Sequence, residues 1–199
     1  MRSPINDVQS PEESQTVEEL LGDDHKRLDE LLKALLAAFD KASTPTVFAR
    51  LDLFWARLAM HIRAENLHLF PAILNGLEDT AAERNELPPP AEAREAIGQL
   101  RSDHDFFMHE LAASVKTIRT MIEASHSESH SRLMDQVRRS IAAVSKRLES
   151  HNEVEEKLVY RLPAKLLTLN QQLTVVEGIR GELQNLPPRF SDAQTGKAD

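Results

Sequence analysis

The amino-acid sequence predicts an all-α protein: an up-down-up-down bundle of four long helices followed by a short fifth helix. The first observation is the composition, since Ala, Leu, Glu and Arg dominate and only 6 of the 199 residues are Gly, which favours helix over strand. The second is periodicity, because apolar residues recur every three or four positions in long stretches and nowhere alternate with a period of two. The third is that short connections join these stretches, which suits antiparallel neighbours.

Length and charge narrow the class of protein further. A chain of 199 residues fits one domain, here residues 16–186 between an arm over 1–15 and a tail over 187–199 that we expect to be disordered. The net charge of −8 argues against nucleic acid as a partner, and the absence of Cys excludes thiolate metal sites and disulfides. The polar N-terminus resembles no signal peptide and no apolar run is long enough to cross a bilayer. We therefore expect a cytoplasmic protein without membrane contact.

The first helix is expected over about residues 17–42. Thr16 and Glu19 form the pattern of a capping box at its start. Its apolar positions step by three or four and leave room for a histidine between two leucines, so this histidine should lie on the buried face. The residues of this face are Leu21, His25, Leu28, Leu32, Leu35 and Phe39.

The second helix is expected over about residues 45–75. Thr44 is its predicted N-cap, with Pro45 in the first helical position, and Asn75-Gly76 is a typical C-cap pattern. Pro71 should kink the last turn or end the helix early, because proline lacks an N–H and its ring collides with the carbonyl four residues back. The buried face carries Leu51, Phe54, Leu58, His61, Glu65, His68 and Ala72.

Three further helices complete the predicted bundle. A loop over 77–90 precedes a third helix over about 91–124, and a turn over 125–131 precedes a fourth over about 130–162. A short helix is expected over about 168–185. The third helix buries Ile97, Leu100, His104, Phe107, Leu111, Val115, Ile118 and Ile122; the fourth buries Val137, Ile141, Val144, Leu148, His151, Glu155, Leu158 and Leu162; the short helix buries Leu173, Val176, Ile179 and Leu183.

One short motif occurs twice on these faces, as His61-x-x-x-Glu65 and His151-x-x-x-Glu155. On an α-helix this spacing places the imidazole and the carboxylate on the same side, one turn apart. Each copy follows a helix with its own buried-face histidine, His25 or His104. His25 and His61 lie about 18 and 17 residues from the break between their helices, and His104 and His151 about 23 and 22 residues from theirs. Each pair should therefore lie level in the bundle, and the repeat places both pairs in a common layer.

These six residues indicate a site for two metal ions. Buried carboxylates are rare unless they are paired or bound to a cation, and no Lys or Arg shares the buried faces that carry Glu65 and Glu155. The alternative is a metal-free interaction protein in which the four histidines are hydrogen-bonded core residues. Imidazole and carboxylate without thiolate suit iron, with zinc or manganese as less favoured candidates. Two ions bridged by Glu65 and Glu155 would leave positions open for a small exogenous ligand.

The chain resembles the hemerythrin-like, or HHE cation-binding, family over about residues 16–165. The resemblance is carried by His25, by His61-x-x-x-Glu65 followed by Leu69-Phe70-Pro71, by His104, and by His151-x-x-x-Glu155 followed by Pro163. It implies a four-helix bundle around a non-haem centre of two iron ions that binds oxygen, nitric oxide or peroxide. It also implies that Glu65 and Glu155 bridge the irons and that the four histidines are terminal ligands.

Two departures from the oxygen-carrying hemerythrins point to a different kind of member. Where the carriers have a second histidine on the third helix, this chain has Met108, and His109 is about 140° around the helix from His104. Where the carriers have an Asp five residues after the fourth-helix histidine, this chain has Glu155 four residues after it. The set is more similar to non-carrier members, which include iron or oxygen sensors, iron–sulfur repair proteins and peroxide-degrading proteins. The repair proteins usually have an N-terminal Cys-containing segment, which this chain lacks.

The expected function is binding of, or reaction with, a small oxidant in the response to oxidative or nitrosative stress or in its sensing. The alternative is a non-catalytic iron- or oxygen-sensing module that acts through an unidentified protein partner. Whether the chain is an enzyme stays open at this point. Ferritin-like di-iron proteins use Glu-x-x-His pairs, so their geometry fits this sequence less well.

Four other polar residues receive minor roles in this interpretation. His68 is expected to be a core histidine near the site or, alternatively, an additional ligand. Asp24 and Asp103 are predicted to lie on the surface, because adjacent helical positions point about 100° apart. Tyr160 is predicted to lie too far round its helix from Glu155 for a redox role.

Overall fold

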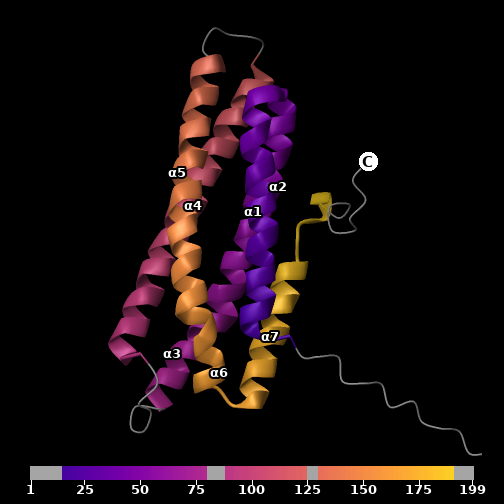
Figure 1. The fold of residues 1–199 in the computed structure, drawn as a ribbon. Coiled ribbons are helices and arrows are strands. Elements are labelled where there is room, and N and C mark those ends of the chain that lie inside the picture. Colours follow the sequence, from indigo (N-terminus) through magenta and orange to yellow (C-terminus); the bar gives the residue numbers. More distant parts are fainter. Residues whose placement is uncertain (1–14, 80–87, 125–129, 191–199) are drawn as a thin grey trace, which may run out of the picture.

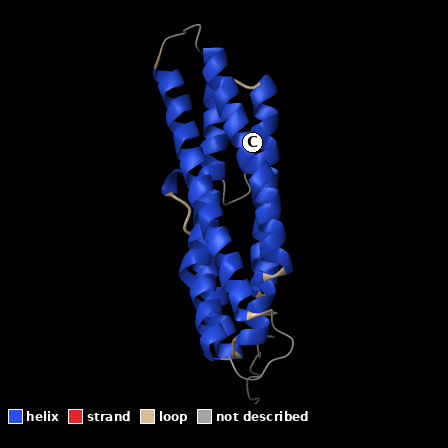
Figure 2. Ribbon diagram, turned by 90° about the vertical axis from the view of Figure 1, so that its left-hand side faces the viewer, coloured by secondary structure: helices blue, strands red, loops and turns tan. Residues whose placement is uncertain are grey.

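The computed structural model of the chain describes residues 15–79, 88–124 and 130–190, and within these ranges four long helices lie side by side as a bundle (Figure 1). Every regular element in the described ranges is helical, and no strand is present there (Figure 2). The long helices are α1 (Val17–Lys41), α2 (Thr44–Ala64), α4 (Pro90–Glu123) and α5 (His130–Lys157). Helix α1 packs against α2, α2 against α4, α4 against α5, and α5 against α1. The predicted all-α class is confirmed.

The first two helices begin close to where the sequence predicts. Thr16 caps α1 in a capping box: the Glu19 N–H donates to Thr16 Oγ1 over 3.2 Å, and the Thr16 N–H donates to Glu19 Oε2 over 2.8 Å. Ser43, not Thr44, is the N-cap of α2, so Thr44 and Pro45 both lie in its first turn. Proline is tolerated at either position because the first N–H groups of a helix have no acceptor within it, and the helix can begin one residue earlier than predicted.

The second predicted helix is interrupted near its C-terminal end. Helix α2 ends at Ala64, and the next five residues form a π-helix, η1 (Glu65–Leu69), before α3 (Phe70–Asp79) follows. The Phe70 N–H donates to the Glu65 carbonyl, five residues back, and Pro71 has no N–H with which to continue an α-helical pattern. The predicted irregularity near Pro71 is therefore confirmed, in the form of a π-helix that carries Glu65.

The predicted C-cap at Asn75-Gly76 is wrong, because α3 continues to Asp79. Gly76 is instead buried against α6 (Leu162–Leu166), where a Cβ would lie 3.1 Å from Leu166 Cβ and 3.2 Å from Leu167 Cδ2. A close approach of two segments, rather than a helix end, thus explains this glycine. Most of the loop predicted over residues 77–90 lies outside the described residues.

The fourth long helix ends before the predicted residue 162. Helix α5 stops at Lys157, a 3-10 turn (η2, Val159–Arg161) follows, and α6 begins directly after it. Leu158, with φ −120° and ψ −62°, departs from helical geometry. In a continuous helix the ring of Pro163 would collide with the carbonyl of Val159, so the chain changes course before the proline.

The predicted short helix is present as α7 (Leu169–Gln184), which packs along α2 and η1 (Figure 1). It is followed by a 3-10 turn (η3, Pro188–Phe190) within the segment expected to be disordered. Arg189 of this turn donates two hydrogen bonds to Asp52 of α2, over 3.0 and 3.1 Å. These bonds hold the turn against the bundle.

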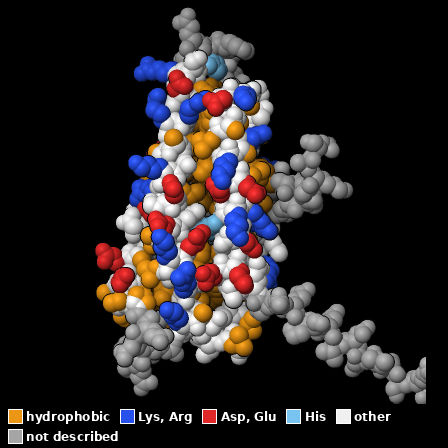
Figure 3. All heavy atoms as spheres, in the orientation of Figure 1, with side chains coloured by type: hydrophobic (Ala, Val, Ile, Leu, Met, Phe, Trp, Pro, Cys, Tyr) orange, Lys and Arg blue, Asp and Glu red, His pale blue; other side chains and the backbone are white. Residues whose placement is uncertain are grey.

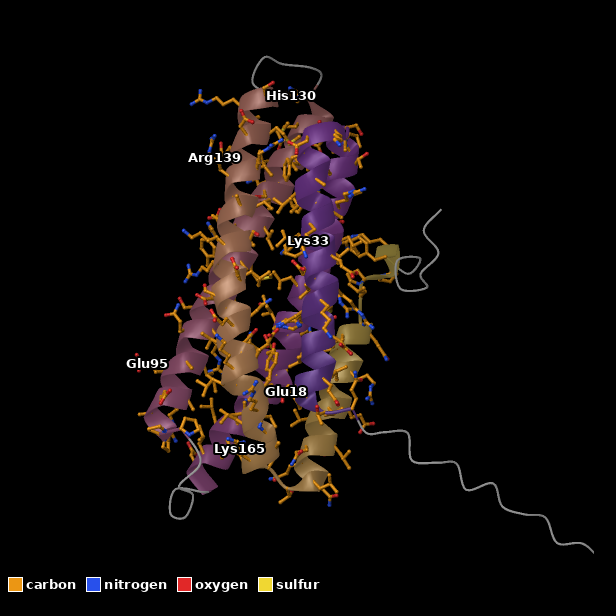
Figure 4. The ribbon with its side chains drawn as sticks, in the orientation of Figure 1. Glu18, Lys33, Glu95, His130, Arg139 and Lys165 are labelled. Carbon is orange, nitrogen blue, oxygen red and sulfur yellow. The ribbon has the colours of Figure 1, made fainter. Side chains whose placement is uncertain are left out.

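The outer surface carries acidic and basic side chains intermixed, as the face drawn in Figure 3 shows. Lys33, Glu95 and Arg139 are exposed and lie on the outer sides of their helices (Figure 4). Two apolar residues predicted to be buried are also exposed, Ile122 at 44% and Leu173 at 42%, because each lies close to an end of its helix, where fewer neighbours cover it. None of the described helices is both long enough and apolar enough to cross a membrane.

A buried polar layer separates two apolar clusters in the core. Along α1, Leu21 belongs to one cluster, Leu28 belongs to the other, and His25 lies between them. The same alternation occurs on α4, at Leu100, His104 and Phe107. The polar layer therefore lies where the sequence places its level histidines.

Candidate metal centre

The two pairs of histidines predicted to be level lie next to each other within each pair. His25 Nε2 on α1 is 3.2 Å from His61 Nε2 on α2, and the ring centroids of His104 on α4 and His151 on α5 are 4.9 Å apart. All four side chains are buried, so the predicted depth match is confirmed. We call the side with His25 and His61 the first half of the centre, and the side with His104 and His151 the second half.

The two glutamates of the repeated motif join these halves. Both Glu65 and Glu155 are 0% exposed, and each directs one oxygen toward each half. Glu65 Oε1 lies 3.6 Å from His61 Nε2, and Glu65 Oε2 lies 3.2 Å from His104 Nε2. The corresponding distances from Glu155 are 3.2 Å from Oε2 to His25 Nε2 and 2.9 Å from Oε1 to His151 Nε2. The six predicted residues thus form one continuous cluster.

The geometry of both halves suits a cation. Ligand atoms lie within 4.8 Å of one another in two groups, one of Glu65, His104, His151 and Glu155 and one of His25, His61 and Glu155. In the second half, Glu65 Oε2, His104 Nε2 and Glu155 Oε1 are buried and make no well-aligned hydrogen bond in the described part of the chain, although Glu65 Oε2 lies 3.2 Å from His104 Nε2 and Glu155 Oε1 lies 2.9 Å from His151 Nε2. Buried polar atoms that lack a well-aligned hydrogen bond are rare in proteins, and a cation bound to all three atoms would satisfy them.

Opposite charges stabilise the metal-free centre. Burial by itself lowers the pKa of His61, but the Glu65 carboxylate and the bond to Asp24 outweigh burial and raise this pKa well above its usual value. Burial by itself raises the pKa of Glu65, but His61 and His104 outweigh it and hold this pKa well below its usual value. The pKa of His151 is also raised, because neighbouring carboxylates outweigh burial. Without a metal, the buried carboxylates therefore favour the protonated form of His61 and His151.

Asp24 and Asp103 are buried beside the centre, and the prediction that they lie on the surface is wrong. His61 Nδ1 donates to Asp24 Oδ2 over 3.0 Å, and His151 Nδ1 lies 3.3 Å from Asp103 Oδ2. The prediction used the angle between neighbours on one helix, whereas each partner histidine belongs to the adjacent helix. A carboxylate at Nδ1 fixes the ring orientation and directs Nε2 into the centre.

An arginine one turn before each motif histidine holds the other oxygen of each aspartate. Arg57 donates to Asp24 Oδ1 and also to the Leu183 carbonyl, the latter over 2.8 Å. Arg147 donates to Asp103 Oδ1 over 2.7 Å. The repeated motif is therefore longer than predicted. It reads Arg-x-x-x-His-x-x-x-Glu, once from α2 into η1 and once on α5, and each copy lies opposite an Asp-His pair on the preceding long helix. This repetition is the sequence pattern that could have identified the aspartates and arginines.

The residue after each motif glutamate contacts a histidine of the other hairpin. Glu156 Oε1 lies 2.8 Å from His25 Nδ1, and Asn66 Nδ2 lies 3.3 Å from His104 Nδ1. Together with the two aspartates, these residues give each of the four histidines a partner at Nδ1. The Nε2 atoms of all four rings therefore face the interior of the centre.

Tyr160 also lies in the centre, contrary to the prediction that it is too far round its helix. Its hydroxyl donates to Glu65 Oε1 over 2.7 Å and lies 3.2 Å from Glu155 Oε2. In a continuous α-helix Tyr160 would point about 140° away from Glu155, but the break after Lys157 returns its ring to the core. Burial, followed by the charges of Glu155 and Glu65, raises the pKa of Tyr160 well above its usual value, so the metal-free protein holds a neutral phenol.

The structure does not bring His68 to the centre. Its ring faces α7: Nε2 lies 3.8 Å from Glu182 Oε1, and a Cβ on Gly178 would lie 2.4 Å from His68 Nδ1. Met108 is half-buried among the apolar residues of the second cluster, and His109 is exposed. Neither residue of α4 supplies a further imidazole to the centre.

We expect His68→Ala to leave the metal content of the protein unchanged, because its ring contacts α7 rather than the four histidines of the centre. The free energy of unfolding should change by less than about 1 kcal/mol, since the side chain is partly exposed and its ion pair is long. Elemental analysis and urea unfolding of His68→Ala beside His61→Ala check both expectations. A loss of metal in His68→Ala would show that this histidine is a ligand after all.

The metal-free protein should lose stability as the pH rises above about 6.5, the usual pKa of histidine. Because the pKa values of His61 and His151 are raised in the folded protein, these histidines contribute fully to the free energy of unfolding below that pH. The contribution is lost as the pH rises through their folded-state pKa values. The pKa values of Glu65 and Asp24 are lowered in the folded protein, so these carboxylates stabilise the fold at neutral pH. Their contribution to the free energy of unfolding is lost as the pH falls through the folded-state pKa values.

Urea unfolding at pH 6 and pH 9, with and without metal, measures this dependence. The loaded protein should keep its stability at the higher pH, because neutral imidazole binds a metal and no longer needs its proton. Metal-free stability that rises between the two pH values would contradict the charge arrangement described above.

Comparison with known protein families agrees with this geometry. A family model described as the hemerythrin HHE cation binding domain matches residues 16–162. The matched range contains His25, Glu155 and every ligand candidate between them, as well as Tyr160. Comparisons with curated proteins and with solved structures gave no match. Because the family model covers most of its length, the chain belongs to the hemerythrin HHE cation-binding family.

Proposed function

We propose that this chain is a non-haem di-iron protein that binds or reacts with oxygen, peroxide or nitric oxide in the response to oxidative or nitrosative stress or in its sensing. Family membership and the buried histidine–glutamate cluster support a metal centre. The bundle would have the up-down-up-down order expected for the family. The proposed ligands are His25, His61, Glu65, His104, His151 and Glu155.

The observation that carries this proposal is the position of two buried carboxylates between two pairs of histidines. A single ion would need one pair, whereas each glutamate here directs one oxygen toward each pair. This arrangement suits two cations bridged by Glu65 and Glu155. Iron held by imidazole and carboxylate can bind small oxidants and exchange electrons with them.

The number of protein ligands supports small-molecule chemistry rather than a closed structural site. Two histidines and two carboxylate oxygens in each half provide fewer ligands than an octahedral ion accepts. Met108 stands where the oxygen carriers have another histidine, and it packs among apolar side chains. Sites that keep a position open are typical of metals that bind an exogenous ligand.

An open groove at the surface reaches His25, the outermost histidine of the first half. The groove has a volume of about 1100 Å³, and its lining includes Lys26, Glu156, Arg161 and the almost buried His25. His25 Nδ1 contacts Glu156, while its Nε2 faces the centre. A small molecule or proton that enters this groove therefore meets the Glu156–His25 pair first.

Elemental analysis of the purified protein, combined with its absorption spectrum, tests the proposal. We expect about two iron ions per chain and absorption bands that change when peroxide or nitric oxide is added. Peroxide consumption that His61→Ala abolishes and His68→Ala retains would identify an enzyme. A protein that takes up no metal on reconstitution, and whose stability is unchanged in His61→Ala, would instead be a metal-free interaction protein.

A non-catalytic sensing module is the second candidate, and the contact between η1 and α7 favours it. Glu65 is the first residue of η1, and η1 packs against α7. Just before η1, Arg63 Nε lies 2.7 Å from Glu182 Oε2 of α7. A change in the position of Glu65 on ligand binding would therefore be transmitted through η1 to α7. This function predicts slower amide hydrogen exchange in α7 when iron binds, without consumption of oxidant; unchanged exchange would argue against it.

A further inference from the structure

We propose that the hydroxyl oxygen of Tyr160 is a ligand of the metal ion in the first half of the centre, together with His25 and His61. The proposal rests on the metal centre proposed above and makes the two halves chemically different. Both halves would share the two glutamates, but only the first half would have a phenol oxygen as an additional ligand.

The hydroxyl lies among the first-half ligand atoms. Tyr160 Oη is 2.7 Å from Glu65 Oε1 and 3.2 Å from Glu155 Oε2. It is also 3.0 Å from His25 Nε2 and 3.3 Å from His61 Nε2. These are the four atoms that the glutamates and histidines direct into the first half, so the phenol oxygen occupies the point on which they converge.

The single proton of the Tyr160 hydroxyl cannot serve all four atoms around it. A phenol has a single proton and can donate it to one acceptor at a time. That proton serves Glu65, at the shortest of the four distances, so the Glu155 oxygen has His25 Nε2, 3.2 Å away, as its remaining neighbour on this side. A cation among these atoms would be coordinated by both carboxylates and by the phenol oxygen, whose proton would leave to solvent as the metal binds.

The internal repeat of the chain provides a comparison for Tyr160. Tyr160 follows Glu155 by five residues, and Phe70 follows Glu65 by the same five. Both rings lie beside a histidine of the first helix of a hairpin: Phe70 stacks on His104 with 5.8 Å between centroids, and the Tyr160 ring is 5.4 Å from that of His25.

The two equivalent aromatic residues therefore differ in one functional group, the hydroxyl. In the second half, beside Phe70, the inward-facing atoms Glu65 Oε2, His104 Nε2 and Glu155 Oε1 make no well-aligned hydrogen bond in the described part of the chain, and no hydroxyl lies among them there. In the first half, their equivalents face the Tyr160 oxygen. Both halves thus have an aromatic ring packed on a histidine, but only Tyr160, in the first half, carries a hydroxyl oxygen.

The experiment uses the fact that Tyr160 is the single tyrosine of the chain. The full-length protein is loaded with iron(II), oxidised with ferricyanide, and examined by absorption and resonance Raman spectroscopy, with iron content measured on the same sample. We expect a visible tyrosinate-to-iron(III) absorption band and enhanced tyrosine ring modes on excitation into that band. In Tyr160→Phe both should vanish while at least one ion per chain is retained, and His68→Ala should keep the wild-type spectrum.

The outcomes separate this proposal from the proposed function. Wild-type protein that contains iron in both halves but shows no tyrosinate modes would overturn the ligand role of Tyr160 and leave the di-iron function standing. Wild-type protein that takes up no iron would overturn both. If Tyr160→Phe does not fold, the wild-type spectrum still decides, because no other residue can give a tyrosinate signal.

Discussion

Glu65→Gln is expected to abolish binding of both proposed iron ions rather than one. Glu65 directs one oxygen to His61 and the other to His104, so the substitution weakens both halves at once. Glutamine keeps the shape of the side chain but has no negative charge, and its NH₂ group cannot bind a cation. Loss of a residue that only orients a metal ligand lowers affinity about 10–100-fold, and loss of a bridging ligand should cost more. Elemental analysis after reconstitution should find well under one ion per chain.

Glu153→Gln is the matched control for this experiment. Glu153 lies on the same helix as Glu155, but its side chain is 59% exposed and pairs with Lys157 at the surface. This variant should retain the full metal content, whereas Glu155→Gln should behave like Glu65→Gln. A Glu65→Gln protein that loses one ion and keeps the other would contradict the proposed bridging role, because the glutamate would then serve only one half.

The histidine pairs could be predicted from the sequence because their positions depend on two regular quantities. Helical rise gives the depth of a residue along the bundle, and helical periodicity gives the face on which it lies. Both quantities hold along α1, α4 and most of α2 and α5, so His25 meets His61 and His104 comes beside His151. The same reasoning placed Glu65 and Glu155 on the buried face.

Tyr160 could not be placed in this way, because the geometry changes between Glu155 and Tyr160. The helix ends at Lys157, and a 3-10 turn precedes Pro163. The proline indicated an irregularity, but not the direction in which the following side chains would turn. The π-helix at Glu65 is a similar case, since Pro71 predicted a disturbance without predicting its form.

Asp24 and Asp103 were misplaced for a different reason. Their own helix directs them away from the histidine that follows them, and periodicity within one helix contains no information about the neighbouring helix. Their burial comes from α2 and α5, which bring Arg57 and Arg147 alongside. A contact between helices becomes visible in the sequence only when both partners are considered together, and the repeated Asp-His and Arg-x-x-x-His pairs contain that information.

The two aspartates should not be equally important for stability, although they occupy equivalent positions. Asp24→Asn is expected to destabilise the metal-free protein by about 3–5 kcal/mol, because it leaves a buried arginine without its counter-charge. The Arg57 side chain is 10% exposed and that of Asp24 is 1% exposed. Asp103→Asn should cost only about 1 kcal/mol, because the Arg147 side chain is 36% exposed and water can solvate its charge.

Urea unfolding of metal-free Asp24→Asn, Asp103→Asn and the double variant Asp24→Asn/Arg57→Met separates these contributions. Removing the arginine as well takes away the unpaired charge, so the double variant should recover a large part of the stability that Asp24→Asn loses. Equal losses in Asp24→Asn and Asp103→Asn would show that the cost lies in the bond to histidine, which both aspartates share, and not in the burial of Arg57. The difference between the stability losses of Asp24→Asn and Asp103→Asn therefore measures the energetic effect of burying Arg57 more deeply than Arg147. The two halves keep the same arrangement around their histidines but differ in how deeply this charge is buried.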